Sequence, residues 1–348
     1  MIDFGFYYNI FNTLTFNALF NFIIGNRGGG KSFSFKYLAI HDFLKTGSQF
    51  IYLRRYQNEL KKVKTWFTDI AEFFPETKFE VKGKTFLING SIAGYSMPLS
   101  TSKIEKSTAF PLVNKIGFDE FIIDKGVYHY LPNEIDYFLE FYETIARTRE
   151  VKVFFMANAI TQTNPYFLYF NIELPYNKEV QTFFNDGSGR FSKKRNKEKP
   201  DLLIQLVNDP RYIDMKQKTR FGQLIKGTDY SGYAIENNFL RDSKEFIQKK
   251  TESAKHKFII EYKAQIIGVW IDYIAGLYFV SQDIDPSNEI RYVFTTQDHK
   301  INTLLISRIS KSPLLKPFFD GFRDGYVRFE SMDVKNVMYE LMKQINMV

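Results

Sequence analysis

Apolar residues in the first two hundred positions fall into short runs that are separated by longer amphipathic stretches. The short runs have the length and composition of buried strands, and they lie at residues 19–24, 49–54, 113–118, 151–156 and 202–207. The amphipathic stretches repeat at helical spacing, and they lie at residues 32–44, 59–74 (with Asn58 as the expected N-cap) and 132–147. This alternation predicts an α/β fold, with helices on both faces of a mostly parallel sheet.

Two regions depart from that alternation. Residues 78–97 alternate strictly and carry the turn signals Lys82-Gly83 and Asn89-Gly90, which predicts a meander of hairpins. After residue 207 the pattern changes, and residues 216–222 indicate a basic linker. Three strand patterns follow at residues 258–262, 265–272 and 277–281, and then two helical patterns at 301–308 and 334–342. We therefore predict a main domain at residues 1–207, a linker at 208–236 and a small α/β domain at 237–348.

The first strand leads into a glycine-rich turn that precedes a helix. Residues 25–32 read Gly25-Asn26-Arg27-Gly28-Gly29-Gly30-Lys31-Ser32, which matches the P-loop pattern G-x-x-x-x-G-K-[ST]. Glycines allow successive backbone N–H groups to point at phosphates, Lys31 supplies positive charge, and Ser32 offers a hydroxyl to Mg²⁺. The strand before and the helix after this segment argue against a chance match. The segment predicts binding of ATP and Mg²⁺.

A second strand end carries acidic residues. Asp119 and Glu120 follow the 113–118 strand, although Lys115 and Gly117 interrupt its apolar pattern. A strand-terminal Asp is the residue that P-loop enzymes use toward Mg²⁺. The adjacent Glu120 is placed to orient or deprotonate a water molecule, which favours hydrolysis over phosphate transfer to a small molecule. Alone this pair would indicate a surface turn; with the P-loop it indicates catalysis.

Phosphoryl transfer also needs a cation near the developing charge. Arg147, at the end of the predicted 132–147 helix, is our first candidate for an arginine finger that reaches a neighbouring subunit. Arg149, Arg54 and Arg27 are the alternatives. Asn158 follows the 151–156 strand, where we expect it to contact the water or the γ-phosphate, with an ordinary turn residue as the equal alternative.

Composition narrows the class of protein. The chain has 47 Lys and Arg against 39 Asp and Glu, a net charge of +8, which favours a polyanionic partner. It has no cysteine, which excludes disulfides and thiolate metal sites, and its four histidines are scattered, so we expect no zinc site. We find neither a signal peptide nor an apolar stretch of about 20 residues, and expect a soluble intracellular protein without a membrane partner.

One basic cluster has no apolar period. Residues 190–199 contain Arg190, Lys193, Lys194, Arg195, Lys197 and Lys199. A solvated surface loop is the favoured interpretation, and contact with nucleic acid is the alternative.

Several of these segments together resemble a known family. The P-loop form G-x-R-G-x-G-K-S and the segments at residues 49–56, 118–122, 147–150, 158–159, 164–168 and 218–222 carry the resemblance. They are similar to those of the genome-packaging ATPases of small tailed bacteriophages. These are relatives of terminase large subunits in the additional-strand, catalytic-glutamate (ASCE) division of P-loop ATPases. The likeness extends over most of the chain.

The resemblance implies a homo-oligomeric ring, a pentamer, that docks on the portal of an empty capsid in the host cytoplasm and drives double-stranded DNA inward. It assigns Lys31 and Ser32 to phosphate and Mg²⁺, Asp119 to the metal, Glu120 to the water, and Arg147 to the neighbouring site. Arg54 and Asn158 match positions that hold the catalytic glutamate or sense the nucleotide. Lys106 matches a lysine that faces the DNA channel, in a polar loop that also carries Lys103. Participation of a packaging RNA stays open.

The resemblance also implies that the C-terminal domain is RNase H-like and has lost its nuclease metal ligands. Asp272 ends a strand, with Asp283 and Asp285 nearby, but they do not make a convincing trio. We therefore do not expect nuclease activity. Three alternative functions stay open: a terminase that also cuts DNA, a nucleotide-dependent capsid or portal assembly subunit that moves nothing, and, more remotely, a small-molecule kinase.

Overall fold

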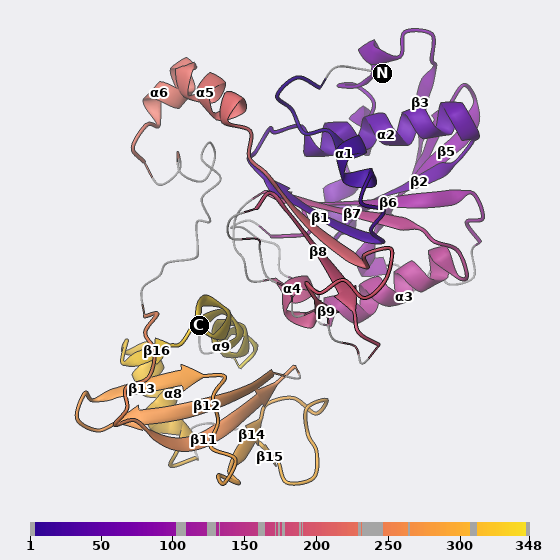
Figure 1. The fold of residues 1–348 in the computed structure, drawn as a ribbon. Coiled ribbons are helices and arrows are strands. Elements are labelled where there is room, and N and C mark those ends of the chain that lie inside the picture. The colour runs from indigo at the N-terminus through magenta and orange to yellow at the C-terminus, as the bar shows by residue number, and fades with distance from the viewer. Residues whose placement is uncertain are drawn as a thin grey trace. The chain divides into compact units, whose positions relative to one another are not determined.

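The computed structural model describes residues 4–101, 109–123, 130–131, 133–158, 164–170, 172, 175, 178–187, 189, 191–228, 231, 246–263, 265–306 and 312–345. The chain folds into two compact units, Met1–Arg241 and Asp242–Val348 (Figure 1). Within the described residues, no helix has both the length and the apolar character that crossing a bilayer requires.

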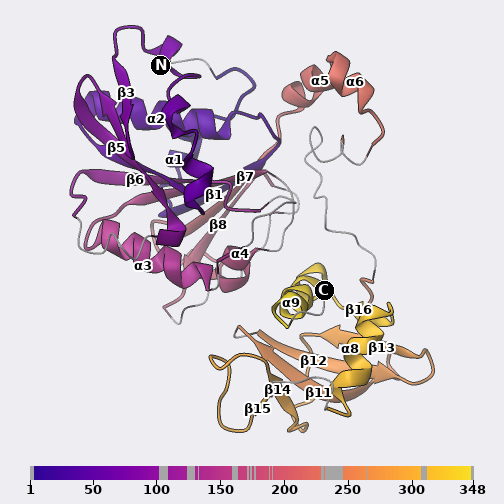
Figure 2. The same ribbon diagram turned by 180° about the vertical axis from the view of Figure 1, so that it is seen from behind.

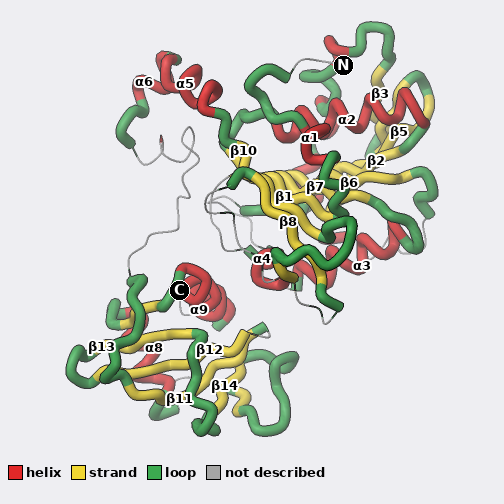
Figure 3. Tube along the Cα trace, in the orientation of Figure 1, coloured by secondary structure: helices red, strands yellow, loops and turns green. Residues whose placement is uncertain are grey.

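The first unit is built on one large sheet, shown as yellow strands in Figure 3. From edge to edge its strands are β3 (Phe79–Lys82), β4 (Thr85–Ile88), β5 (Ser91–Pro98), β2 (Gln49–Arg54), β6 (Val113–Asp119), β7 (Lys152–Asn158), β1 (Phe20–Gly25), β10 (Leu202–Val207), β8 (Val180–Asn185) and β9 (Phe191–Ser192). The strands from β5 to β10 in this order are parallel, and an antiparallel pair completes each edge. The predicted mostly parallel sheet is confirmed.

Helices cover both faces of this sheet, as Figures 1 and 2 show from opposite sides. The helices on one face are α1 (Ile10–Leu14) and α2 (Lys31–Thr46), and those on the other are α3 (Glu134–Ala146) and α4 (Pro165–Phe170). Each face has its own apolar core, with Phe35 buried on the α2 side and Phe138 on the α3 side. Burial of these two cores is the main favourable term that holds the layers together.

The α2 core explains the two residues that interrupt the β6 pattern. A Cβ atom on Gly117 would lie 2.4 Å from the ring of Phe35, so this close helix–sheet contact requires glycine. Lys115 is buried and its Nζ lies 3.0 Å from a carboxylate oxygen of Asp42 on α2. Both residues serve the packing of β6 against α2.

The predicted helix at 59–74 is wrong. The segment instead forms three short 3₁₀ helices, η1 (Gln57–Leu60), η2 (Val63–Thr65) and η3 (Ala71–Phe73), and Asn58 lies inside η1 instead of capping a helix. The apolar residues do pack inward: the Trp66 ring stacks on Phe50 at 5.0 Å between centroids, and Phe67 stacks on Phe79 at 4.5 Å. Tertiary packing of these aromatic rings therefore overrides the helical period.

The predicted hairpins at 78–97 are confirmed. Asn89 and Gly90 have φ values of 50° and 80°, as the two central residues of a type I′ turn require. Gly83 joins β3 to β4 with φ 59°.

The segments at the end of the first unit are more ordered than the sequence predicts. The basic cluster at 190–199 contains the short strand β9, which pairs with β8, and the sequence analysis missed both strands. The described lysines of the cluster are exposed, and Lys199 Nζ lies 3.3 Å from Glu150. Arg190 lies outside the described residues. The predicted linker contains two helices, α5 (Pro210–Lys218) and α6 (Arg220–Leu224). Asp209 as N-cap and Pro210 at the first turn are the start signals that we overlooked.

The second unit has a six-stranded sheet. In spatial order its strands are β15 (Leu304–Leu305), β14 (Arg291–Val293), β11 (Lys255–Tyr262), β12 (Gln265–Asp272), β13 (Leu277–Ser281) and β16 (Val327–Phe329). β11, β12 and β13 are antiparallel neighbours, whereas β14, β15 and β16 each pair in parallel. Helices α8 (Leu315–Arg323) and α9 (Met332–Gln344) follow.

The second unit has the mixed strand and helix content expected for the C-terminal segment, and α9 confirms the helix predicted at 334–342, whereas α8 was not predicted. The helix predicted at 301–308 is wrong, because Leu304–Leu305 pairs with β14 as a strand and residues 307–308 lie outside the described part. Apolar runs this short do not distinguish a strand from a helix.

Candidate active site

The glycine-rich turn lies between β1 and α2, as predicted. Gly28 and Gly30 have φ values of 80° and 87°, which side-chain-bearing residues rarely adopt. A Cβ atom on Gly25 would lie 2.4 Å from the carbonyl oxygen of Val207 on β10. These glycines let the backbone fold into the tight turn that surrounds phosphates in P-loop proteins.

Lys31 is the buried cation of this turn. Its Nζ donates hydrogen bonds to the carbonyl oxygens of Gly25 (3.0 Å) and Asn26 (2.7 Å), and lies 3.5 Å from Oδ1 of Asn158. Burial lowers the pKa of Lys31 to about 8, and the nearby charge of Asp119 opposes that shift.

β7, which carries Asn158, lies between β1 and β6, the additional-strand order of the ASCE division.

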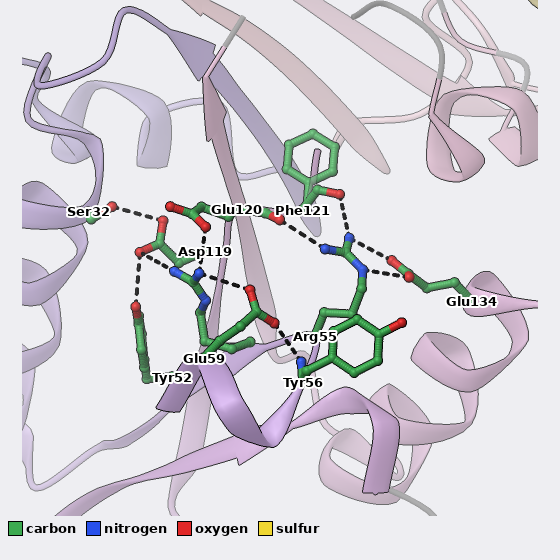
Figure 4. Close-up of polar contacts among 10 residues, drawn as sticks. Ser32, Tyr52, Arg55, Tyr56, Glu59, Asp119, Glu120, Phe121 and Glu134 are labelled. Carbon is green, nitrogen blue, oxygen red and sulfur yellow. Dashed lines mark hydrogen bonds and ion pairs between the residues drawn. The ribbon is translucent and has the colours of Figure 1, made fainter. Parts of the chain in front are cut away.

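Asp119 joins the P-loop to the end of β6 (Figure 4). The Ser32 hydroxyl donates to Oδ1 of Asp119 at 2.9 Å, and the Tyr52 hydroxyl donates to Oδ2 at 3.0 Å. Burial and the Asp119 charge raise the pKa of Tyr52 well above its ordinary value, so this phenol stays a donor. A hydroxyl and a carboxylate are oxygen ligands of the kind that Mg²⁺ prefers, so the residues fit the predicted metal.

Glu120 is held by Arg54. Arg54 Nη2 donates to Oε2 of Glu120 at 2.5 Å and to Oε1 of Glu59 at 2.9 Å, and its Nη1 lies 3.6 Å from Asp119. The Glu120 side chain is 58% exposed. The structure thus brings Arg54, Asp119 and Glu120 together.

A buried arginine behind this group was missed by sequence reasoning. Arg55 is 2% exposed and makes a two-pronged ion pair with Glu134, at 2.7 and 2.9 Å. Its guanidinium also donates to the carbonyl oxygens of Glu120 (3.2 Å) and Phe121 (2.6 Å). The available signal was an acidic residue in the first turn of a predicted helix, together with a second arginine after the β2 strand.

The structure does not bring Arg147 to this site. Arg147 is exposed and follows the last residue of α3, whereas Glu134, at the first residue, contacts Arg55 beside Glu120. The 13 residues of α3 span about 20 Å. An open recess beside Arg147 is lined by Glu140, Glu143, Thr144 and Thr148.

The other two arginine candidates have structural contacts. The Arg149 guanidinium donates to four backbone carbonyl oxygens, so it is fixed in its own unit. Arg27 is an exposed residue of the P-loop, and its carbonyl oxygen accepts a hydrogen bond from the Tyr212 hydroxyl of α5 at 2.8 Å. Lys103 and Lys106 lie outside the described residues.

The acidic residues of the second unit are engaged locally. Asp272 accepts hydrogen bonds from the hydroxyls of Thr251 and Ser253 and from the backbone N–H groups of residues 274 and 275. Asp283 pairs with Lys250 at 3.0 Å, and Asp285 accepts from Ser287. No group of three or more His, Asp or Glu within the described part of the chain is arranged to hold a metal ion.

The chain is similar to known proteins over nearly its whole length. A family model described as Podovirus DNA encapsidation protein (Gp16) matches residues 2–347. The chain is 37% identical to the DNA packaging protein of Bacillus phage phi29 over 345 residues, 99% of each protein, and 38% identical to that of Bacillus phage PZA over the same length and coverage.

Solved structures that are similar to this chain come from the same group of proteins. The structure of the bacteriophage phi29 viral genome packaging motor assembly aligns with a TM-score of 0.75 and 37% identity, over 98% of this chain and 100% of that one. The crystal structure of the N-terminal domain of the phi29 DNA packaging ATPase aligns with a TM-score of 0.53 and 38% identity, over 60% of this chain and 100% of that domain.

Proposed function

The chain belongs to the Podovirus DNA encapsidation protein (Gp16) family, and on this premise we propose that it is an ATP-driven motor that moves double-stranded DNA into a preformed capsid. One observation carries the proposal: the hydroxyl of Ser32 in the P-loop and the carboxylate of Asp119 meet at 2.9 Å, with Glu120 beside them. This arrangement supports nucleotide hydrolysis.

The P-loop performs binding. In the proposed complex the backbone N–H groups of residues 25–30 and the Lys31 ammonium bind the phosphates of ATP, helped by the positive end of α2. Ser32 and Asp119 would hold Mg²⁺, and a bound Mg²⁺ would supply positive charge toward the phosphate oxygens. Tyr52 orients the Asp119 carboxylate through its second oxygen.

Glu120 and two arginines perform catalysis. We assign Glu120 to orient and deprotonate the attacking water. We assign Arg54 to keep the Glu120 carboxylate in an inactive position until a conformational change releases it. Asn158 lies next to Lys31, where it senses the nucleotide. Arg147, about 20 Å along α3 from the Glu134 contact, acts as an arginine finger in the neighbouring subunit of a pentameric ring.

The partners follow from the family and from charge. We propose double-stranded DNA as the cargo, the portal of the empty capsid as the docking site, and the host cytoplasm as the location before docking. Lys103 and Lys106 are our candidates for DNA phosphate contact, and the excess of Lys and Arg supports a polyanionic partner. Within this scheme residues 1–207 form the ATPase domain, 208–236 the linker and 237–348 a nuclease-like domain without its metal site.

Steady-state ATP turnover tests the proposal. The rate should rise when double-stranded DNA and portal-bearing empty capsids are added together, and this rise should weaken steeply with salt because DNA grip is electrostatic. A Lys31→Ala variant corrects for contaminating ATPases. A rate that does not respond to DNA and capsids would instead favour a capsid assembly subunit.

A further inference from the structure

Helix α3 is tied to strand β6 at its first turn. Arg55 donates to Glu134, the first residue of α3, and to the carbonyl oxygens of Glu120 and Phe121, which follow β6 (Figure 4). The hydroxyl of Tyr166 on α4 donates to the same Glu134 carboxylate at 3.0 Å. Glu120 has φ 59°, a conformation that costs energy in a residue with a side chain, so contacts to its backbone hold it in place.

The same helix is tied to the same strand at its last turn. Arg149 donates to the carbonyl oxygen of Ile145 on α3 at 2.5 Å. It also donates to the carbonyl oxygens of Phe110 (2.8 Å), Pro111 (3.0 Å) and Val113 (2.5 Å), where the chain enters β6. Arg147, with φ 51°, lies in the short segment between Ile145 and Arg149.

Aromatic rings fill the space between the two ties. Phe138 of α3 stacks on Phe118 of β6 with 6.2 Å between centroids, and Phe155 of β7 packs against Phe138 at 4.9 Å. All three rings are fully buried. Close-packed rings of this kind resist sliding, so α3 and β6 move together.

We propose that β6 and α3 form one rigid strut that couples Glu120 in a subunit's own site to the Arg147 that the subunit presents to its neighbour. Arg55 and Arg149 are the positioning residues that fix the two ends of this strut. The inference rests on the proposed roles of Glu120 and Arg147 and adds the physical link between them. A change in how Glu120 sits would pass through Glu134 to the far end of α3.

Subunit mixing tests the strut directly. The finger donor carries Lys31→Ala, which disables its own site and leaves Arg147 intact, and the acceptor carries Arg147→Ala, which leaves its own site intact. Neither subunit alone should turn over ATP, and their mixture should recover activity at acceptor sites. Further substitutions are then placed in the donor or in the acceptor.

The informative variant removes the buried ion pair without leaving a lone charge. Arg55→Met with Glu134→Leu replaces both members by apolar side chains, a change that buried ion pairs often tolerate in stability. In the donor it should lower recovered turnover about tenfold to hundredfold, because small displacements of a catalytic group have effects of that size. In the acceptor the same double variant should also lower turnover, because Arg55 no longer holds the backbone of Glu120 in the acceptor's own site. Arg149→Lys should lower turnover only when it is in the donor.

A matched control lies on the opposite face of the same strand. Lys115→Met with Asp42→Leu removes the buried ion pair between β6 and α2, and this ion pair does not contact α3. In the donor this double variant should leave recovered turnover within about twofold of the parent mixture. Melting temperatures are measured for every variant. If the loss of recovered turnover came from lower stability alone, the Arg55/Glu134 and Lys115/Asp42 double variants would lose turnover equally.

The outcomes separate the two proposals. Recovered turnover that is insensitive to Arg55→Met with Glu134→Leu and to Arg149→Lys in the donor overturns the strut, and leaves the motor assignment intact. A parent mixture that recovers no activity contradicts the finger assignment, and the strut falls with it.

Discussion

Asp119 in the first unit and Asp272 in the second occupy the same kind of place, the last residue of a buried strand, and yet have different partners. The Asp119 carboxylate is contacted by Ser32 and Tyr52, which are 87 and 67 residues away in the sequence. The Asp272 carboxylate accepts from residues at most 21 positions away, including the N–H groups of the next turn.

The difference shows what converts a strand-end acid into a chemical site. Asp119 lies at the carboxyl edge of parallel strands, where loops from several strands converge. Asp272 ends one strand of the β12–β13 hairpin, so its partners are the residues of its own turn and a neighbouring segment. The acid in the first unit faces other elements, whereas the acid in the second unit stabilises its own loop.

The same substitution at Asp119 and at Asp272 should show the difference between the two acids most strongly. Asp119→Asn should lower ATP turnover by about 10³-fold or more, because it would weaken the proposed metal contact, which is expected to contribute several kcal/mol in the transition state. Asp272→Asn should leave turnover within about twofold and lower the melting temperature instead. Similar losses of turnover in both variants would show that the second unit takes part in hydrolysis.

The pH dependence sharpens the role of Lys31 in the first unit. Burial lowers its pKa to about 8, so the free protein loses this charge as pH rises above that value. We expect kcat/KM for ATP to fall about tenfold per pH unit above pH 8, since kcat/KM reports the free enzyme. A Lys31→Arg variant, whose side chain stays charged, should lack this fall. A flat profile in the parent up to pH 9.5 would contradict the binding role.

Tyr52 offers a smaller test of the Asp119 environment. Tyr52→Phe removes one hydrogen bond to the carboxylate, a change of about 0.5–1.5 kcal/mol. The Mg²⁺ concentration for half-maximal ATP turnover should rise about two- to tenfold. Tyr142→Phe, on α3, is the control and should leave this concentration unchanged. No shift in the Tyr52 variant would mean that Asp119 is oriented without it.

The smallest effect concerns acid stability in the second unit. Hydrogen bonds from Thr251, residue 275 and Ser253 hold the pKa of Asp272 well below its usual range. Its contribution to stability is therefore present above the unfolded pKa of about 3.9 and is lost as pH falls below it. The difference in melting temperature between the parent and Asp272→Asn should be constant from pH 5 to 7 and shrink below pH 4. A difference that grows on acidification would contradict these contacts.

Much of the nucleotide site could be predicted from local patterns. The P-loop is a contiguous motif, and the strands β2, β6 and β7 that bring Arg54, Asp119 and Asn158 to one edge are recognisable as short apolar runs, although Lys115 and Gly117 interrupt the run of β6. Parallel strands place their carboxyl ends together, so convergence followed from topology.

The supporting contacts could not be predicted because they join residues far apart in sequence. Arg55 and Glu134 are 79 positions apart, and their local signals, a second arginine after β2 and an acidic residue at a helix start, do not show that both are buried. The 59–74 segment failed for a related reason, since the stacking of Trp66 on Phe50 outweighs its helical period. The start of α5, in contrast, carries a local signal, because Asp209 is its N-cap and Pro210 lies in its first turn.

Packaging of labelled double-stranded DNA into purified portal-bearing empty capsids tests the central claim most directly. The claim is that hydrolysis at the P-loop and Asp119-Glu120 drives the movement of DNA. The parent protein with ATP should protect the DNA from added nuclease, and Glu120→Gln, which should still bind ATP, should protect essentially none. Full protection with Glu120→Gln, or with the parent in the absence of ATP, would contradict the account.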